Sequence, residues 1–293
     1  MTVLALLVAF LAVTGWLAPR QLARSSRAPR VPRAAIATWA ALILACAADV
    51  VMLAHRLVTA DHHGRGPFGW LLPASARGTG GSAGHTQAFW MGMAILAALS
   101  GVVLTAWIRG ARARRRHRQQ LDLVARRHED GWLVMDTDEP AAWCVAGDGG
   151  RIVLTVGALR MPPAHRGAVL AHENAHLAGR HHLITSAATA LGRGLRWLPA
   201  ARLAGDRVPV LVEMAADDRA LRSTSPRVLA EALCLFATAR TRPASLGAGD
   251  HAVVDRVRRL LEPAPPLPRP AAAAWWLASA ALPVAPILLA CGP

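Results

Sequence analysis

The chain has 293 residues, of which 54% are hydrophobic, and its mean hydropathy of +0.31 excludes an ordinary soluble protein. Its formal net charge is +15, and all 33 basic residues are arginine. Such a charge could attract nucleic acid, but the densest basic run, residues 109–118, directly follows an apolar stretch, where anionic lipid headgroups are the nearer partner. We therefore expect a membrane protein that contacts lipids and has no direct nucleic-acid partner.

Four apolar stretches are each long enough to cross about 30 Å of hydrocarbon as a helix of roughly 20 residues. Arginines fill the loop after the first stretch and the segment after the third, so the positive-inside rule places both in the cytoplasm and both termini outside. The sequence thus predicts an N-terminal membrane domain with three spans (1–108), a cytoplasmic domain (109–270), and a fourth span with the C-terminus (271–293). The apolar stretches are 2–19, 34–54, 88–108 and 271–291.

The cytoplasmic segment begins with a strand pattern and continues with helices. Residues 132–136, 141–147 and 151–159 are rich in β-branched and aromatic residues, and GDGG at 147–150 is typical of a hairpin turn. Pro162 and Pro163 then precede a run with helical spacing of apolar residues, which predicts a helix that begins at the prolines. Residues 183–205 read as an apolar helix broken near Pro199. The expected fold class is a mainly α membrane protein with a cytoplasmic α+β domain between spans three and four.

The predicted helix contains AHENAHLAGRHH at 171–182, in which His172, Glu173 and His176 form the pattern H-E-x-x-H. Histidines four apart on a helix project from one face and can hold one zinc ion. Glu173 can face a water on that zinc, whose pKa falls towards about 7, and can accept its proton during attack on a peptide carbonyl. The pattern therefore predicts one Zn²⁺ per chain and hydrolysis without a covalent intermediate, although so short a motif also occurs without metal.

Two residues could complete the zinc site. His182 would do so if Gly179 ended the helix in a tight turn. Glu213 would do so from a separate helix, with Asp217 four residues later on the same face to hydrogen-bond the free nitrogen of a ligating histidine. Since residues 181–192 stay apolar and helical, we expect the helix to run past Gly179. This favours Glu213 as the third ligand and leaves His181 and His182 as polar residues at a helix end.

With these motifs, the chain resembles the BlaR/MecR-type integral membrane zinc metallopeptidases. The resemblance extends over the four apolar stretches and the segments AAWCVAGDGGRIVLTVGAL, VLAHENAHLAGRHH, RWLPAARL and EMAADDRA. It implies a gluzincin-type zinc protease domain, a small sheet plus the HExxH helix, in the cytoplasm of a bacterium, with the chain in the plasma membrane. By this resemblance His172 and His176 bind zinc, Glu173 is catalytic, Glu213 is the third ligand and Asp217 supports the site.

The resemblance also points to a substrate-binding strand, which would pair with an extended peptide. In one respect the chain departs from the family: antibiotic-sensing members carry a penicillin-binding domain after the fourth span, whose S-x-x-K motif needs a lysine that this sequence lacks. Only Gly292 and Pro293 follow Cys291, so we expect no such sensor domain and no direct β-lactam sensing. The strand residues are Trp143, Cys144, Val145, Ala146 and Gly147.

Three functions compete. The leading hypothesis is a membrane zinc endopeptidase that cleaves a cytosolic winged-helix repressor, and also itself, in signal-regulated proteolysis. The second is an HtpX-like protease for quality control of membrane proteins, and the third is a signalling or scaffold protein with an inactive site. His251 and Arg256 could stabilise the oxyanion, but DHAVVDRVRRLL is more typical of an exposed basic helix. No oligomeric state is predicted.

Overall fold

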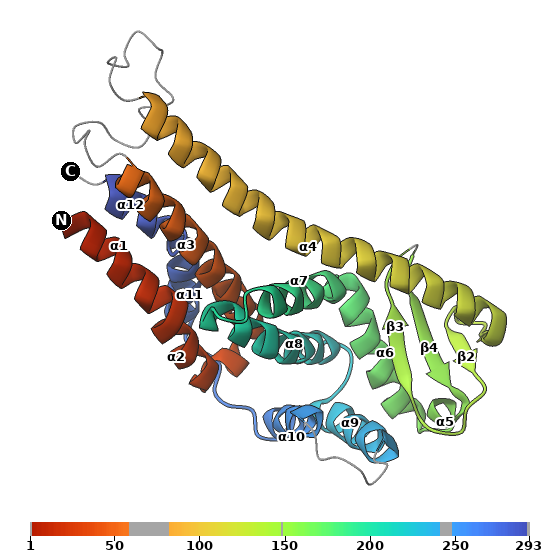
Figure 1. The fold of residues 1–293 in the computed structure, drawn as a ribbon. Helices are drawn as coiled ribbons and strands as arrows, with labels where there is room; N and C mark the ends of the chain where they lie inside the picture. The colour runs from red at the N-terminus through yellow and green to blue at the C-terminus, as the bar shows by residue number, and fades with distance from the viewer. Residues whose placement is uncertain (1, 59–81, 148, 241–247, 292–293) are drawn as a thin grey trace. The chain divides into compact units, whose positions relative to one another are not determined.

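The computed structural model describes residues 2–58, 82–147, 149–240 and 248–291 (Figure 1). Most of them are helical, and one small sheet lies between α4 and α6 in chain order. The elements are α1 (Thr2–Ala12), the π-helical η1 (Val13–Leu17), α2 (Ala18–Arg24), the 3₁₀-helical η2 (Ala28–Arg30), α3 (Pro32–Val58), α4 (Ser82–Val124), β1 (Arg126–Arg127), β2 (Leu133–Met135), β3 (Ala142–Val145), β4 (Arg151–Thr155), α5 (Val156–Leu159), α6 (Pro163–Ala178), α7 (His181–Gly194), α8 (Pro199–Ala220), α9 (Pro226–Arg240), α10 (Ala248–Leu261), α11 (Arg269–Ala281) and α12 (Ala285–Cys291).

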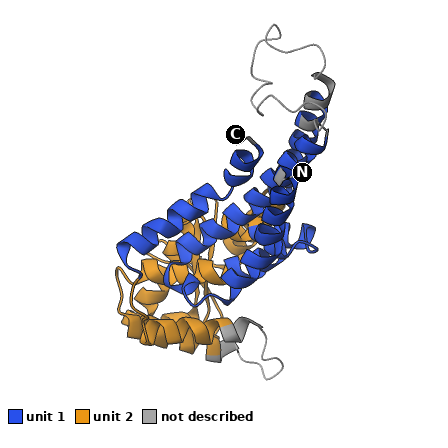
Figure 2. Ribbon diagram, turned by 90° about the vertical axis from the view of Figure 1, so that its left-hand side faces the viewer, with its two compact units in different colours: residues 1–105, 188–208, 267–293 blue, residues 106–187, 209–266 orange. Residues whose placement is uncertain are grey.

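The chain divides into two compact units (Figure 2). Unit 1 comprises Met1–Thr105, Ala188–Val208 and Leu267–Pro293, and unit 2 comprises Ala106–Ala187 and Pro209–Pro266. Residues 188–208 come from the segment expected to be cytoplasmic, yet they group with the N-terminal helices. The division into three domains stays a prediction.

Three helical stretches in the described residues are long and apolar enough to cross a membrane, namely Val3–Arg24, Pro32–Leu57 and Phe89–Val124. They overlap the first three predicted spans. The fourth predicted span is not one continuous helix, because α11 ends at Ala281 and α12 begins at Ala285. Pro283 and Pro286 explain the break, since proline lacks a backbone N–H and clashes with the preceding helical turn. The count of four spans is therefore not confirmed.

Within unit 1, α11 packs on α3 through polar as well as apolar contacts. The Trp275 indole donates to Thr38 Oγ1 at 2.7 Å, and Thr38 Oγ1 lies 2.8 Å from Ser279 Oγ. The turn before α8 adds a small apolar core in which Leu198 packs with Cys46. The predicted break near Pro199 is confirmed, because Pro199 is the first residue of α8.

The sheet in unit 2 has the strand order β1-β2-β4-β3. Strands β2 and β4 run parallel, and β3 and β4 form an antiparallel hairpin that pairs Cys144 with Ile152. The first two predicted strands are confirmed, and so is the hairpin between β3 and β4, in which the Gly150 N–H donates to the Gly147 carbonyl at 2.9 Å; Asp148 of the predicted turn lies outside the described residues. The third is wrong beyond Thr155, where the chain turns into α5 because Thr155 Oγ1 accepts a hydrogen bond from the Ala158 N–H at 3.2 Å and caps the helix.

Apolar cores form on both faces of the sheet, and they position the elements of the site. On one face, Leu121 at the end of α4 packs with Val145 and Val153. On the other face, Leu154 packs with Val169 of α6 and Ala232 of α9. Alternate residues of β3 and β4 thus face α4 and α6 in turn, as the two-residue period of a strand requires. Strand β3 is consequently held against the helix that carries the H-E-x-x-H motif.

Candidate metal centre

Helix α6 brings the two motif histidines together. The helix begins at Pro163, as the sequence predicts, and its regular turns place His172 and His176 on one face. Their Nε2 atoms lie 3.0 Å apart. At this distance each nitrogen presents either a lone pair or a proton to the other. A cation bound by the lone pairs of both nitrogens would stabilise this arrangement.

Helix α8 supplies two carboxylates at the predicted spacing. Glu213 Oε2 lies 3.3 Å from His172 Nε2, and Glu213 Oε1 lies 3.4 Å from His176 Nε2. Each of the three residues offers one ligand atom, these atoms lie within 4.8 Å of one another, and the group could hold a metal ion. Asp217, one helical turn further on, places Oδ1 3.0 Å from His172 Nδ1, the ring nitrogen that faces away from Glu213. The acids therefore face inward and do not form an exposed acidic face.

Arg256 of α10 completes the cluster, contrary to the expectation of an exposed basic helix. It is only 7% exposed. Its Nε and Nη2 donate to the two carboxylate oxygens of Asp217 at 2.8 and 2.7 Å, and its Nη1 lies 3.1 Å from Glu213 Oε2. The arginine thus binds both acids at once. The side chain of His251, the other residue considered for the oxyanion, is outside the described part of the chain.

The cluster is electrostatically coupled. Burial alone would lower the pKa of His172, but its hydrogen bonds to Asp217 and Glu213 outweigh burial and raise the pKa to about 9. Burial would raise the pKa of Glu213, but hydrogen bonds from His172 and His176 and the charge of Arg256 lower it strongly. The same balance, with Arg256 as the main partner, lowers the pKa of Asp217. Both carboxylates are therefore ionised, and their negative charge would favour a bound cation.

The end of α6 differs from the prediction that the helix runs past Gly179. The helix ends at Ala178, and Arg180 adopts a left-handed φ of 48° before α7 begins at His181. A Cβ on Gly179 would collide with the ring of His181, so the close turn needs a glycine here. The turn that a ligand set with His182 requires is therefore present. It does not, however, bring His182 into the metal-capable group, which consists of His172, His176 and Glu213.

Instead of His182, the turn directs His181 towards the site. His181 Nδ1 lies 3.1 Å from His176 Nδ1, behind the ring nitrogen that faces Glu213. From the sequence alone, His181 is expected only as a polar residue at a helix end, and Gly179 is the signal for the turn that redirects it. His182 lies near Arg114 and Arg180, and its pKa is lowered by burial and by their charges.

Strand β3 lies beside Glu173. Cys144 is partly buried, and its thiol hydrogen-bonds the Glu173 carboxylate. Burial and the Glu173 charge both raise the pKa of this thiol, so it stays protonated. Of the other predicted strand residues, Val145 and Ala146 are buried, Trp143 is half-buried and Gly147 is exposed. The structure thus brings the predicted strand to the predicted catalytic glutamate.

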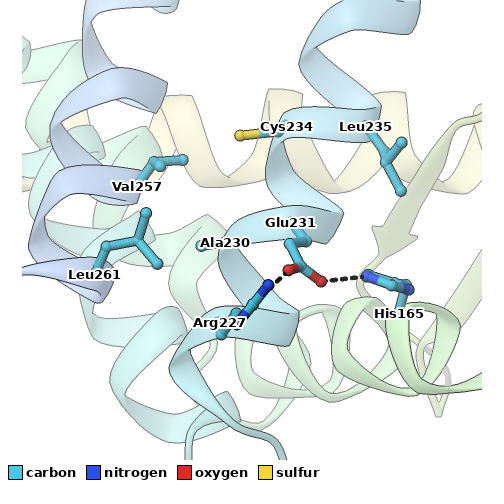
Figure 3. A pocket seen from close by; sticks show the side chains of 8 residues that line it. All are labelled: His165, Arg227, Ala230, Glu231, Cys234, Leu235, Val257 and Leu261. Carbon is cyan, nitrogen blue, oxygen red and sulfur yellow. Dashed lines mark hydrogen bonds and ion pairs between the residues drawn. The ribbon is translucent and has the colours of Figure 1, made fainter.

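A separate cavity of about 670 Å³ opens beside α9 and α10 (Figure 3). It shares no residue with the metal-capable group. At one end, Glu231 accepts a hydrogen bond from Arg227 Nε at 2.8 Å and lies 2.9 Å from His165 Nε2. The remaining lining is apolar apart from a cysteine, and comprises Ala230, Cys234, Leu235, Val257 and Leu261.

A comparison with protein families supports this interpretation of the cluster. Residues 109–236 match peptidase family M48. The M48 match covers the sheet, α6 and the two inward acids of α8, and M48 metallopeptidases are in general zinc-dependent. It supports a membrane-type zinc metallopeptidase, and together with the three long apolar helices it supports a location in the membrane. It does not support the narrower BlaR/MecR assignment. Among the curated proteins and among the solved structures, no match was found.

Proposed function

We propose that the protein is an integral membrane zinc endopeptidase with Glu173 as its catalytic base. The observation that carries this proposal is the convergence of two histidines and one glutamate, within 4.8 Å, next to a further glutamate on the same helix turn. Catalytic zinc sites commonly have three protein ligands and one open position, whereas structural zinc sites are closed by four. The set His172, His176 and Glu213 fits the catalytic type.

The surroundings of the set also fit zinc. Asp217 Oδ1 lies 3.0 Å from His172 Nδ1, so with zinc bound it would favour the tautomer that ligates through Nε2. His181 can do the same for His176. Arg256 has three of its donor nitrogens directed at Asp217 and Glu213, so it positions these acids and has little left for a substrate carbonyl.

In the proposed reaction, bound zinc would polarise the scissile carbonyl and acidify a water molecule. Glu173 would accept the proton of that water and pass it to the leaving amine. The Cys144 thiol, hydrogen-bonded to the same carboxylate, would hold Glu173 in place between the strand and the helix. An extended substrate would lie along β3.

We further propose a cytosolic protein as the substrate, with a winged-helix repressor as the leading candidate. This rests on the resemblance to BlaR/MecR-type peptidases and on the positive-inside bias, which places the segment after the third span in the cytoplasm with both termini outside. Quality control of membrane proteins is the alternative, and substrate range separates the two, since a repressor protease would leave misfolded membrane proteins uncut.

The test is cleavage of dye-quenched casein by the detergent-purified full chain, with zinc measured per chain. We expect Glu173→Gln to retain one zinc and to lose about 10²- to 10⁴-fold in kcat, the usual contribution of a general base. Glu231→Gln, which alters a carboxylate outside the cluster, is the matched control and should cleave as the wild type does. Equal cleavage by Glu173→Gln and wild type would sink the enzyme function and leave a scaffold protein.

A further inference from the structure

Strand β3 has a free edge in the described part of the chain. The sheet order β1-β2-β4-β3 puts β3 last, with β4 as its one neighbour in the sheet. In an antiparallel pair, alternate residues direct both backbone groups to the partner strand, and the residues between them direct both groups outward. The Ala141 carbonyl accepts from the Thr155 N–H at 3.0 Å, and the Ala141 N–H donates to Thr155 Oγ1 at 2.9 Å.

This pairing fixes the direction of every residue in the strand. With Ala141 facing β4, Trp143 and Val145 face β4 as well, in register with Val153 and Arg151. The residues that point their N–H and C=O groups to the free edge are then Ala142, Cys144 and Ala146. Of these, Cys144 is the one whose thiol reaches Glu173.

One of the three outward carbonyls already has a donor. Arg118, near the end of α4, donates from Nη1 to the Ala146 carbonyl at 2.6 Å. The guanidinium is held there, because Arg118 is only 8% exposed. Gly147 makes room for it: a Cβ at this position would collide with Arg118 Nη1, and the φ of +106° also favours glycine.

We propose that Arg118 closes the free edge of β3 and so sets the register of the substrate. This rests on the proposed endopeptidase function and on pairing of an extended peptide along β3. A peptide can bond the carbonyls of Ala142 and Cys144, but at Ala146 the guanidinium takes the place of its N–H. The substrate residue paired with Cys144 therefore lies beside Glu173, and pairing ends there on the Ala146 side. Arg118 is a positioning residue that limits the length of pairing.

If Arg118 limits the pairing, only certain substrate amides contribute to binding. In the wild type, two substrate N–H groups, two residues apart, bond to Ala142 and Cys144. Methylating either nitrogen should raise KM roughly 3- to 10-fold, the effect of one backbone hydrogen bond. The next N–H in the same alternation, which faces Ala146, should tolerate methylation. In Arg118→Met the Ala146 carbonyl is free, so this third amide should become sensitive by the same factor.

The experiment maps a cleavage site in casein by mass spectrometry and then measures KM and kcat for synthetic peptides of that site, N-methylated one position at a time. The full chain is used in detergent, as wild type, Arg118→Met and Arg118→Lys, with the exposed Arg116→Met on the same helix as matched control. We expect two sensitive amides in wild type, Arg118→Lys and Arg116→Met, and three in Arg118→Met. If Arg118→Met does not fold, Arg118→Gln, which is too short to reach Ala146, should also give three.

Three sensitive amides in the wild type, or the same two in Arg118→Met as in wild type, would overturn the role of Arg118 and leave the peptidase intact. Cleavage of casein by Glu173→Gln at the wild-type rate would overturn the proposed function itself, and the register with it. A change of kcat alone, with an unchanged methylation pattern, would also count against Arg118 as the limit of pairing.

Discussion

Two histidines of helix α6 each belong to a cluster of the same composition, a histidine, a carboxylate and an arginine, whose other members come from α8, α9 and α10. In one, His165 lies 2.9 Å from Glu231, which accepts from Arg227. In the other, seven residues along the helix, His172 lies 3.0 Å from Asp217, which accepts from Arg256. The side chains of Arg227 and Glu231 are 83% and 44% exposed, whereas those of Arg256 and Asp217 are 8% and 1% exposed.

The difference shows that composition alone does not make a metal site. Burial weakens solvent screening, so the second cluster shifts the pKa of His172 to about 9. Spacing matters equally. Four residues after His172 comes His176, and four residues before Asp217 comes Glu213, so further ligands converge. The exposed cluster has Val169 and Arg227 at the corresponding positions, which offer no ligand.

The largest expected effect comes from removing the acid that only the buried cluster has. Glu213→Ala should lose zinc, because two histidines alone leave the site one ligand short. Glu231→Ala should keep one zinc per chain, as measured by metal analysis of the purified proteins. If Glu213→Ala kept zinc and His182→Ala lost it, the ligand set would be three histidines. The extra acid of the buried cluster would then not explain its metal binding.

Arg256→Met tests what burial adds to the arginine. It leaves Asp217 and Glu213 buried without their cation, which should destabilise the metal-free protein by about 3–5 kcal/mol. Chemical unfolding in detergent measures this loss. Arg256→Lys keeps the charge but lacks the planar guanidinium that binds both acids. Its stability should therefore lie between those of the wild type and Arg256→Met. Wild-type stability in Arg256→Met would mean that the buried network adds nothing to the fold.

Asp217→Asn tests the acid behind the metal-capable group. Asparagine keeps the shape but weakens the bond that orients His172, so zinc affinity should fall about 10- to 100-fold. The neighbouring Asp218→Asn is the matched control, since Asp218 pairs with Arg259 and is not one of the three residues that could hold the metal. Competition with a fluorescent chelator gives both affinities. Equal affinities would remove Asp217 from the site.

The pH dependence of zinc binding should follow His172. Its folded pKa of about 9 lies above the ordinary value, so in the metal-free protein its contribution to stability is complete below about pH 6.5 and is lost as pH rises through 9. Zinc needs the neutral ring and must displace that proton. Apparent zinc affinity should therefore rise about tenfold per pH unit between 7 and 9, and level off above. A flat profile would show that His172 is neutral before zinc binds.

Much of this site follows from local patterns. The prolines before α6, the four-residue spacing of His172 and His176, and the same spacing of Glu213 and Asp217 all act within one helix, where sequence distance fixes direction. The hairpin before α6 was equally readable, because glycines with positive φ at 147, 149 and 150 are what the turn requires.

The rest depends on contacts between distant segments. Arg256 meets Asp217 across 39 residues, and α10 by itself looks like an exposed basic helix. His181 reaches His176 only because the chain reverses at Arg180, whose φ no pattern predicts for an arginine. Residues 156–159 follow a β-branched run and therefore look like a continuation of the strand, but the Thr155 hydroxyl caps a helix there. In the fourth apolar stretch, hydropathy predicts one continuous span, but two prolines interrupt the helix.

The smallest effect should come from the exposed cluster. Arg227→Met removes one partner of Glu231, but solvent screens this pair and water can replace the arginine, so little should change. Zinc content, casein cleavage and the midpoint of thermal unfolding should all match the wild type. Set beside Arg256→Met, this variant compares an exposed arginine with a buried one, because each change removes an arginine bound to the carboxylate partner of an α6 histidine. Loss of zinc in Arg227→Met would show that the two clusters are coupled along α6, and burial would no longer explain their difference.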